Sequence, residues 1–378
     1  MKIVYCINSV YLSGGMERIT LVKANALARI PGNEVWVVVT DAQQEPIIPL
    51  QGTHLVDLGV KYFEVTNGIM GILKKKRLHK KLLERYLNDI KPDVVIAVGG
   101  CEKGVVPLLK VYPKPVLIRE LHLERHYRFR KQIKNIKEWL YAWGGDQYDY
   151  HWVMKKYDHI VLLTNEDRQR YWQGWKNVSV IPNPITSQFD RKSNCDVKKA
   201  IAVGRLTHQK NFSALIRIWR RVAVHHPDWQ LEIWGEGELQ RAIQQQIEEA
   251  GLEDGIFLRG YTSEASRKMS QASMYLLSSY YEGLPLVMIE AMSVGLPVVS
   301  FMCPTGPQDI LDDGRTGYLV PVGEENLFAE KVCRLIEDES LRKTMGKAAL
   351  EESGKYRVDT IIPLWMNLFQ ELLDKKKR

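Results

Sequence analysis

Two glutamates separated by seven residues frame the most informative segment of the chain, Glu282-Gly283-Leu284-Pro285-Leu286-Val287-Met288-Ile289-Glu290. A buried strand is predicted just before this segment and a helix over 285–294, because proline is favoured at a first helical position. The amides and the dipole at the start of a helix attract a phosphate. Glu282 precedes the helix and Glu290 lies inside it, so both carboxylates can accept from the hydroxyls of one sugar or ribose. The alternative is a capped helix with two solvated glutamates.

Two cations, Arg205 and Lys210, follow a strand predicted over 199–204 and flank a short loop before a helix that Asn211 is expected to cap. A leaving nucleoside diphosphate gains negative charge as its bond to a sugar breaks. One preorganised donor aimed at such charge contributes roughly 2.7–4 kcal/mol to catalysis. The pair is therefore predicted to stabilise a leaving diphosphate, and two surface cations on a loop are the alternative. The sequence has no Asp-x-Asp motif for a divalent metal.

The segments that must position these groups alternate between short apolar strands and helices, which is typical of βαβ units and parallel sheets. Two such series lie on either side of Ile181-Pro182-Asn183-Pro184-Ile185, a proline-containing linker. We predict an α/β fold of two doubly wound Rossmann-like domains facing a central cleft, over 1–183 and 184–358. A terminal helix over 359–378 is expected to pack back toward the amino-terminal domain. Ligands are expected at the carboxyl ends of the strands.

The composition narrows the class of protein. With 378 residues, 45% hydrophobic and 26% charged, the chain is long enough for two ordinary globular domains. No segment has the roughly 18–20 apolar residues of a membrane span, and residues 1–8 do not form a signal peptide. The five cysteines are dispersed, with no Cys-x-x-Cys pair, which indicates a reducing, cytoplasmic location without zinc.

The motifs jointly resemble those of the retaining GT-B glycosyltransferases usually called family 4, the glycosyl transferases group 1. Glu282 and Glu290 match the family's Glu-x7-Glu, and Gly204-Arg205-Leu206 with Lys210-Asn211 resembles its Gly-Arg-Leu…Lys-Asn element. Ser13-Gly14-Gly15-Met16-Glu17-Arg18 is similar to its amino-terminal glycine loop. The segments 303–310 and 313–320 resemble the late part of its donor domain. The resemblance covers essentially the whole chain.

The resemblance implies a metal-independent, cofactor-free transfer of a sugar from a nucleotide diphosphate donor, expected to be a UDP-hexose or UDP-N-acetylhexosamine. Arg205 and Lys210 would stabilise the leaving diphosphate, Glu282 would hold the transferred sugar, and Glu290 the ribose. Attack from the front face would retain the anomeric configuration. The expected donor-binding set is Gly15, Gly204, Gly283, Leu284, Pro285, Leu286, Glu290 and Tyr261, the last beside the base; Tyr261 as a plain surface residue is the alternative.

The resemblance also implies a histidine after a strand of the amino-terminal domain, near the transferred sugar. The sequence there reads Ile118-Arg119-Glu120-Leu121-His122. His122 is the preferred catalytic match, and Glu120 is the alternative occupant of the same space. A bland surface or core histidine is the remaining interpretation.

The net charge of +8 is concentrated in two basic stretches of the amino-terminal half. Residues 72–91 form a predicted helix with lysines on one side and leucines on the other, which suits an anionic membrane surface. Residues 125–131 mix cations with aromatic side chains. Because the family's amino-terminal domain binds the acceptor, we expect a glycan or lipid-linked acceptor and peripheral contact with the inner face of the plasma membrane. A core-packed helix with a solvated outer face is the alternative.

Three functions are therefore compared. A glycosyltransferase in surface polysaccharide or glycoconjugate assembly is preferred. A nucleotide-sugar epimerase or a phosphorylase of GT-B shape keeps the fold but changes the reaction, and the sequence offers no context for a phosphorylase's pyridoxal lysine. A basic nucleic-acid-binding protein, suggested by the pI of about 9.0, is disfavoured because no recognition motif is present.

Overall fold

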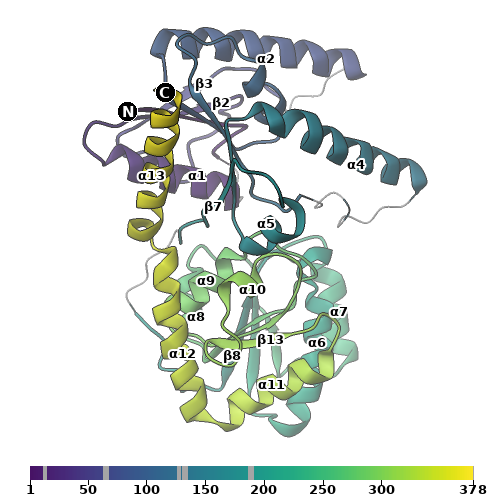
Figure 1. Ribbon diagram of the computed structural model, residues 1–378. Helices are drawn as coiled ribbons and strands as arrows, with labels where there is room; N and C mark the ends of the chain where they lie inside the picture. Colours follow the sequence, from purple (N-terminus) through teal and green to yellow (C-terminus); the bar gives the residue numbers. More distant parts are fainter. Residues whose placement is uncertain (12–14, 63–67, 126–128, 130–134, 186–190, 378) are drawn as a thin grey trace. The chain divides into compact units, whose positions relative to one another are not determined.

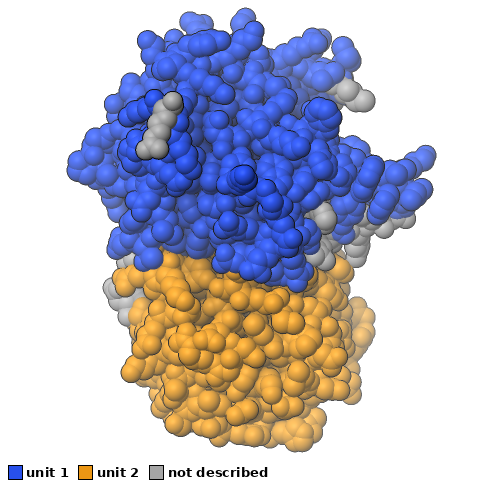
Figure 2. Space-filling model, in the orientation of Figure 1, with its two compact units in different colours: residues 1–186, 358–378 blue, residues 187–357 orange. Residues whose placement is uncertain are grey.

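The structure is a computed structural model, and it describes residues 1–11, 15–62, 68–125, 129, 135–185 and 191–377. The chain forms two compact units (Figure 2). Unit 1 comprises Met1–Thr186 and Val358–Arg378, and unit 2 comprises Ser187–Arg357. The predicted division lay at 183/184 and 358/359. Ser13, Gly14 and most of the basic stretch over 125–131 lie outside the described residues.

Unit 1 contains a parallel seven-stranded sheet with the strand order β3-β2-β1-β4-β5-β6-β7. Its strands are β1 (Lys2–Ile7), β2 (Glu34–Val39), β3 (Thr53–Asp57), β4 (Val94–Ala97), β5 (Val116–Glu120), β6 (His159–Leu162) and β7 (Val178–Val180). Its helices are α1 (Gly15–Ala28), α2 (Gly68–Ile90), α4 (Ile136–Tyr148), α5 (Asn165–Tyr171) and α13 (Val358–Lys377), with the short turns η1 (Glu102–Gly104), η2 (Val106–Leu108), η3 (Asp149–Val153) and η4 (Met154–Lys156).

Both faces of this sheet are buried, because alternate residues of β1 belong to different hydrophobic clusters. Ile3 and Tyr5 pack with α1 and α13, whereas Val4 and Cys6 pack with α2. Strands covered on both faces read as continuous apolar runs, which is why valine and isoleucine dominate them. Helix α13 follows unit 2 in the chain but packs in unit 1 beside α1 (Figure 1).

Helix α2 bears on the two interpretations of its leucines, and its contact with a membrane stays a prediction. The carboxyl-terminal part of its leucine face packs on the core: Leu83 and Leu87 are fully buried, and Tyr86 and Ile90 pack beside them, whereas Leu78 is 44% exposed. The helix therefore contributes to the fold through those leucines, as the alternative interpretation held. Among the described residues, no helix is long and apolar enough to cross a membrane.

Unit 2 contains a parallel six-stranded sheet with the order β10-β9-β8-β11-β12-β13. Its strands are β8 (Lys199–Val203), β9 (Gln230–Trp234), β10 (Ile256–Leu258), β11 (Met274–Leu277), β12 (Val298–Phe301) and β13 (Gly317–Val320). Its helices are α6 (Phe212–His225), α7 (Gln240–Glu249), α8 (Ala265–Met269), α9 (Leu286–Ser293), α10 (Pro307–Ile310), α11 (Glu325–Glu337) and α12 (Glu339–Ser353), with the turns η5 (His208–Lys210) and η6 (Gly354–Tyr356).

The two parallel, helix-covered sheets confirm the predicted α/β class and its doubly wound domains. In unit 2 the neighbours β9, β8 and β11 are parallel, so their carboxyl ends lie along one edge of the sheet. The loops that follow them carry Glu236, Arg205 and Glu282 respectively. Residues spread over some eighty positions of sequence are thereby brought to one edge, as Rossmann-like folds require for ligand binding.

Gly235 is the tightest point of this edge. Its φ is 142°, and a Cβ there would lie 1.9 Å from the backbone oxygen of Gly204. We expect Gly235→Ala to lower the stability of unit 2 by about 2–5 kcal/mol, because backbone strain and a backbone clash add. Chemical denaturation measures this. Gly323→Ala is the matched control: φ is 93° with open space around it, so only about 1 kcal/mol is expected. Equal losses for both variants would contradict the close approach.

Candidate active site

The loops that follow β8 and β11 are joined by hydrogen bonds into one structure. The backbone N–H of Tyr280 donates to the carbonyl of Gln209 at 2.9 Å, and Gln209 Nε2 donates to the carbonyl of Tyr281 at 2.9 Å. Ser278 Oγ donates to the carbonyl of Lys210 at 3.0 Å. These bonds fix Lys210 relative to the residues that lead into Glu282.

Lys210 and Glu282 form the central contact of the unit 2 site. Lys210 Nζ lies 2.7 Å from Glu282 Oε1, with the side chains 16% and 7% exposed. Ser279 Oγ donates to the same oxygen at 2.6 Å. The ammonium has three N–H donors, so one directed to Glu282 leaves others for a ligand. The other carboxylate oxygen, Oε2, accepts no hydrogen bond from the described residues.

Arg205 lies at the same edge of the sheet but, unlike Lys210, it has no carboxylate partner among the described residues. It is exposed. Its charge acts on the neighbouring Tyr281, whose pKa burial and Glu282 raise and Arg205 lowers. Gly204 lies against the side chain of Lys210, since a Cβ there would be 3.3 Å from Lys210 Cε. The predicted pair of cations is thus one anchored lysine and one unpaired arginine.

The turn before α9 is held by the loop that follows β12. The N–H of Glu282 donates to the carbonyl of Pro304 at 3.2 Å, and Thr305 Oγ1 donates to the carbonyl of Glu282. Gly306, with φ of 105°, packs so closely that a Cβ would lie 2.4 Å from Pro285 Cδ. This packing orients Gly283 and Leu284 and the first amides of α9, which have no acceptor within the helix.

Two local predictions are wrong in detail. Helix α9 begins at Leu286, and Pro285 is its N-cap rather than its first residue. Asn211 occupies the N-cap of α6, but its side chain makes no capping bond and its backbone is left-handed, with φ of 49°. This left-handed residue joins η5 to α6 directly after Lys210.

Glu290 is buried in α9. Its charge and the charge of Glu282 both act on Tyr275, a buried residue that the sequence did not indicate. Tyr275 on β11 is buried, and its hydroxyl donates to the carbonyl of Val203 at 3.1 Å. Burial raises the pKa of Tyr275, and the charges of Glu282 and Glu290 raise it further. Both predicted carboxylates therefore act on one hydroxyl at the end of β8. The sequence could not predict this role, because a tyrosine in a buried strand looks like any other core residue.

Tyr261 follows β10 at the same edge of the sheet. Its side chain is 66% exposed, and its N–H donates to Glu236 Oε1 at 3.4 Å. The structure thus brings Tyr261, Glu236, Arg205 and Glu282 to consecutive strands, with a freely accessible ring at one end. Among the described residues, no aromatic ring or cation stacks on this ring, so its predicted contact with a nucleotide base stays a prediction.

In unit 1, the structure separates the two alternatives at the end of β5. Glu120 is fully buried and paired with Lys23 of α1, which is itself fully buried. His122 lies beside them, with Nε2 3.0 Å from Glu120 Oε1. Asn183 Nδ2 contacts His122 Nδ1 at 3.4 Å. Glu120 therefore holds His122, and only His122 of the two lines the adjacent pocket.

The charge of Glu120 is fixed by its neighbours. Burial by itself would raise its pKa, but Lys23 and His122 outweigh burial and hold the pKa of Glu120 at about 2. Burial lowers the pKa of Lys23, and Glu120 opposes that change. Lys23 Nζ also lies 4.8 Å from the ring centroid of Trp365 in α13. The pair thus joins α1, β5 and α13.

The pocket of unit 1 has an empty volume of about 830 Å³, part of it open to solvent. Its walls come from the start of α1, the loops after β4 and β5, the end of α4 and η3; they include Met16, Arg119, His122, Arg125, Asp146 and Tyr150. Arg125 pairs with Asp146 at 3.2 Å and covers the Tyr150 ring at 3.4 Å. Gly15 opens α1 next to Met16. Aromatic faces and paired charges of this kind suit a polyhydroxylated ligand.

Two buried carboxyls near this pocket have raised pKa values. Burial raises the pKa of Glu102 to about 7, against the opposing effect of Arg119. Burial also raises the pKa of Asp167 to about 7, although the N–H of Arg125 donates to it. Within the described residues, no group of three or more histidines, cysteines or acidic residues is placed to hold a metal.

The chain is similar to known proteins in both sequence and fold. Residues 185–352 match the model of the family described as Glycosyl transferases group 1. The chain is 27% identical to the amylovoran biosynthesis glycosyltransferase AmsD of Erwinia amylovora, with 97% of this chain and 99% of that protein aligned. It is 33% identical to the poly(ribitol-phosphate) alpha-N-acetylglucosaminyltransferase of Staphylococcus aureus over 57% of this chain and 44% of that protein.

The fold is similar to that of solved GT-B enzymes. A TarM variant from S. aureus, solved with fondaparinux, alpha-GlcNAc-glycerol and UDP, matches with a TM-score of 0.74. The match covers 97% of this chain and 99% of that chain at 17% identity. The GT-B architecture that the sequence predicted is thereby confirmed.

The buried pair in unit 1 gives a stability prediction. Lys23→Met should destabilise the protein by about 3–5 kcal/mol, because it removes the buried ammonium that neutralises the buried carboxylate of Glu120. Lys23→Met/Glu120→Gln should recover most of this loss, and urea unfolding measures both. As the control, Lys80→Met removes a half-exposed pair with Glu84 and should cost less than about 1 kcal/mol. A double variant as unstable as the single one would contradict the pairing.

Glu102 gives a prediction about pH. Its folded pKa of about 7 exceeds its ordinary value of 4.5, so the unfolded chain releases this proton first. Stability is therefore lost as pH rises from 4.5 to 7. Glu102→Gln should be more stable than wild type at pH 8, by on the order of 2–3 kcal/mol, and close to it at pH 4.5. Denaturation at both pH values tests this. Glu45→Gln, at an exposed site, should match wild type throughout; a gain equal at both pH values would contradict the titration.

Proposed function

Because the chain is a glycosyltransferase of GT-B fold whose unit 2 carries the group 1 family's domain, we propose the following reaction. The enzyme transfers a hexose or an N-acetylhexosamine from a UDP-sugar to a glycan or lipid-linked acceptor, with retention and without a metal. The product would enter surface polysaccharide or glycoconjugate assembly. The relatives named for amylovoran biosynthesis and for poly(ribitol-phosphate) glycosylation support that setting, and the UDP bound to TarM supports the nucleotide.

The observation that carries the proposal is the Lys210–Glu282 contact beside the unpaired Arg205. A donor lying along this edge would place its diphosphate between the two cations and the first amides of α9. Glu282 Oε2 would then accept from hydroxyls of the transferred sugar. Buried Glu290 would bind the ribose, and Tyr261 would stack on the base. Two cations supply the charge that a divalent metal supplies in other glycosyltransferases.

In the proposed reaction, the bond between the anomeric carbon and the diphosphate oxygen breaks and the electron pair leaves with UDP. The acceptor hydroxyl attacks the same face of the sugar, and its proton passes to the leaving phosphate oxygen. Arg205 and Lys210 stabilise the charge that develops on UDP. His122, held by Glu120, would contact the acceptor side of the reacting sugar.

A donor screen in EDTA tests this proposal. UDP, GDP and their common sugars would be compared by thermal shift and by slow hydrolysis without acceptor. A ligand at 100 times its Kd stabilises by roughly 2.7 kcal/mol, so the correct donor should raise Tm. We expect one UDP-sugar to bind and be hydrolysed without metal, and Glu282→Gln and Lys210→Ala each to lose about 10²–10³ in hydrolysis rate.

The matched control for these variants is Glu325→Gln. Glu325 pairs with Arg217 at 2.6 Å and with Arg221 at 3.4 Å, joining α6 to α11, so this change also removes a carboxylate that is paired with cations of unit 2. It should hydrolyse the donor at the wild-type rate. A strict requirement for a divalent cation would contradict the role of Arg205 and Lys210. Conversion of the donor into its epimer would instead identify an epimerase.

A further inference from the structure

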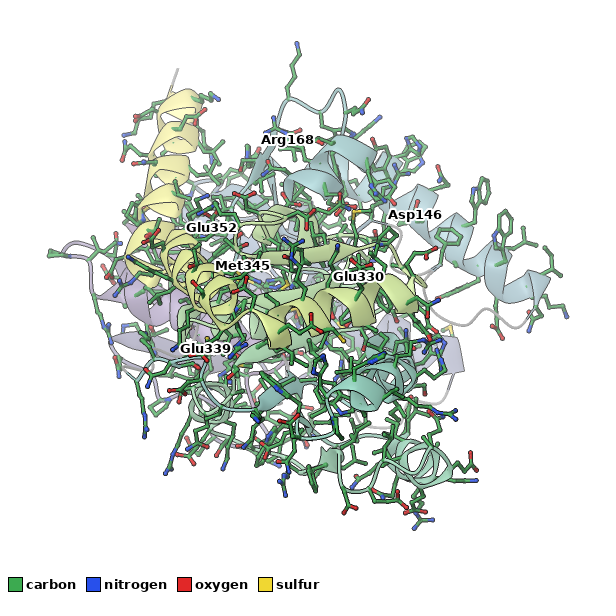
Figure 3. All side chains as sticks on the ribbon, turned by 90° about the horizontal axis from the view of Figure 1, so that it is seen from below. Asp146, Arg168, Glu330, Glu339, Met345 and Glu352 are labelled. Atoms are coloured by element: carbon green, nitrogen blue, oxygen red, sulfur yellow. The ribbon has the colours of Figure 1, made fainter. Side chains whose placement is uncertain are left out.

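Helix α4 of unit 1 leaves large apolar side chains uncovered. Ile136, Trp139, Leu140 and Trp143 recur with the spacing of one helical face, and they are 67%, 41%, 52% and 49% exposed. We call these four residues the α4 face. Figure 1 shows α4 extending away from the sheet of unit 1, and Figure 3 shows side chains projecting from it beyond the labelled Asp146. A continuous apolar face of this kind indicates a binding surface.

The composition of the α4 face is that of a lipid interface. Trp139 and Trp143 stack with ring centroids 6.3 Å apart. Tyr141 and Tyr148 are also exposed, but they lie on nearly the opposite side of α4 and do not belong to this face. Tryptophan and tyrosine are favoured at the boundary between headgroups and acyl chains, because their rings are apolar and their N–H or O–H groups remain hydrated. A surface that met only water would not collect them.

The charges around α4 favour an anionic partner. In the sequence, residues 125–137 contain six lysines and arginines and no acidic residue. Among the described cations, Lys137 of α4 precedes the two tryptophans, and Lys155 and Lys156 end the helical turns that follow α4; all three are exposed. The acidic residues of the run have partners: Glu138 accepts from Asn135, Asp146 from Arg125 and Asp149 from Lys103. Cations near an anionic bilayer each strengthen binding roughly fivefold.

The α4 face is also continuous with the pocket of unit 1. Asp146 at the end of α4, and Asp149 and Tyr150 in η3, line the pocket that contains His122. A bilayer against the α4 face would therefore lie next to the acceptor pocket. We propose that the α4 face binds an anionic lipid bilayer, and that this contact presents a lipid-linked acceptor to the pocket. The second clause rests on the proposed function, whereas the first does not.

Vesicle binding by the full chain tests the proposal. Vesicles of phosphatidylcholine alone and of phosphatidylcholine mixed with phosphatidylglycerol would be used at low and high salt. We expect wild type to bind only the anionic vesicles, less so at high salt, with its tryptophan fluorescence quenched by lipids brominated on their acyl chains. Trp139→Ser/Leu140→Ser/Trp143→Ser should bind at least about tenfold more weakly and lose the quenching.

The matched control is Ile72→Ser/Leu73→Ser/Leu78→Ser, which removes three similarly exposed apolar residues of the lysine-rich helix α2. This variant should bind vesicles like wild type. Loss of binding in the α2 variant with binding retained in the α4 variant would overturn the proposal. So would a wild-type dimer that ignores vesicles and becomes monomeric in the α4 variant, because the face would then belong to a second copy of the chain.

Donor hydrolysis without acceptor separates this inference from the proposed function. The α4 variant should hydrolyse the UDP-sugar at the wild-type rate, since the changed residues lie outside both candidate sites. Vesicle binding by a wild type that hydrolyses no sugar nucleotide would uphold the α4 face while refuting the proposed donor. Equal vesicle binding by wild type and the α4 variant would refute the α4 face whatever the donor.

Discussion

The buried pair of Lys23 and Glu120 constrains much of unit 1. Two opposite charges taken out of water are stable only when they stay together and well oriented. Because one comes from α1 and the other from β5, the pair fixes the helix over the sheet, and Trp365 of α13 closes over the ammonium. His122 contacts the same carboxylate. Of the three residues, only His122 lines the pocket, and its position depends on the fully buried pair of Lys23 and Glu120.

Unit 2 positions its candidate site residues through loops and not through a fully buried ion pair. Its central carboxylate, Glu282, also accepts from a lysine, but Lys210 is partly exposed and belongs to a neighbouring loop rather than a helix. The position of that loop depends on backbone features: the left-handed Asn211, the close approach of Gly235 to Gly204, and the contact of Gly306 with Pro285. The first unit thus positions a side chain through buried charge, and the second through glycine-dependent turns that leave its cations accessible.

The sequence predicted most helices and strands, and it predicted which residues meet at the carboxyl edge of the unit 2 sheet. Buried parallel strands have continuous valine and isoleucine runs, and parallel order brings Arg205, Lys210 and Glu282 to one edge without further information. It could not predict that Lys23 is buried, since its partner lies 97 positions away and a lysine on a helix usually faces solvent. The leucines of α2 could not show which of them are buried, because an amphipathic helix has the same pattern whether its apolar face meets a core or a bilayer. The face of α4 has a regular helical period, but a periodic apolar face does not reveal whether it packs on a core or stays exposed.

The place of α13 has a consequence for how the protein is made. This helix belongs to unit 1, yet the ribosome synthesises it only after all of unit 2. Until Trp365 and Phe369 arrive, Lys23 and the face of α1 lack their cover, so the first half of the chain cannot reach its final state in the order in which it emerges. Unit 2, whose residues are contiguous, can fold first. The nascent chain would therefore complete its second half before its first, and chaperones would meet an unfinished amino-terminal sheet for most of synthesis.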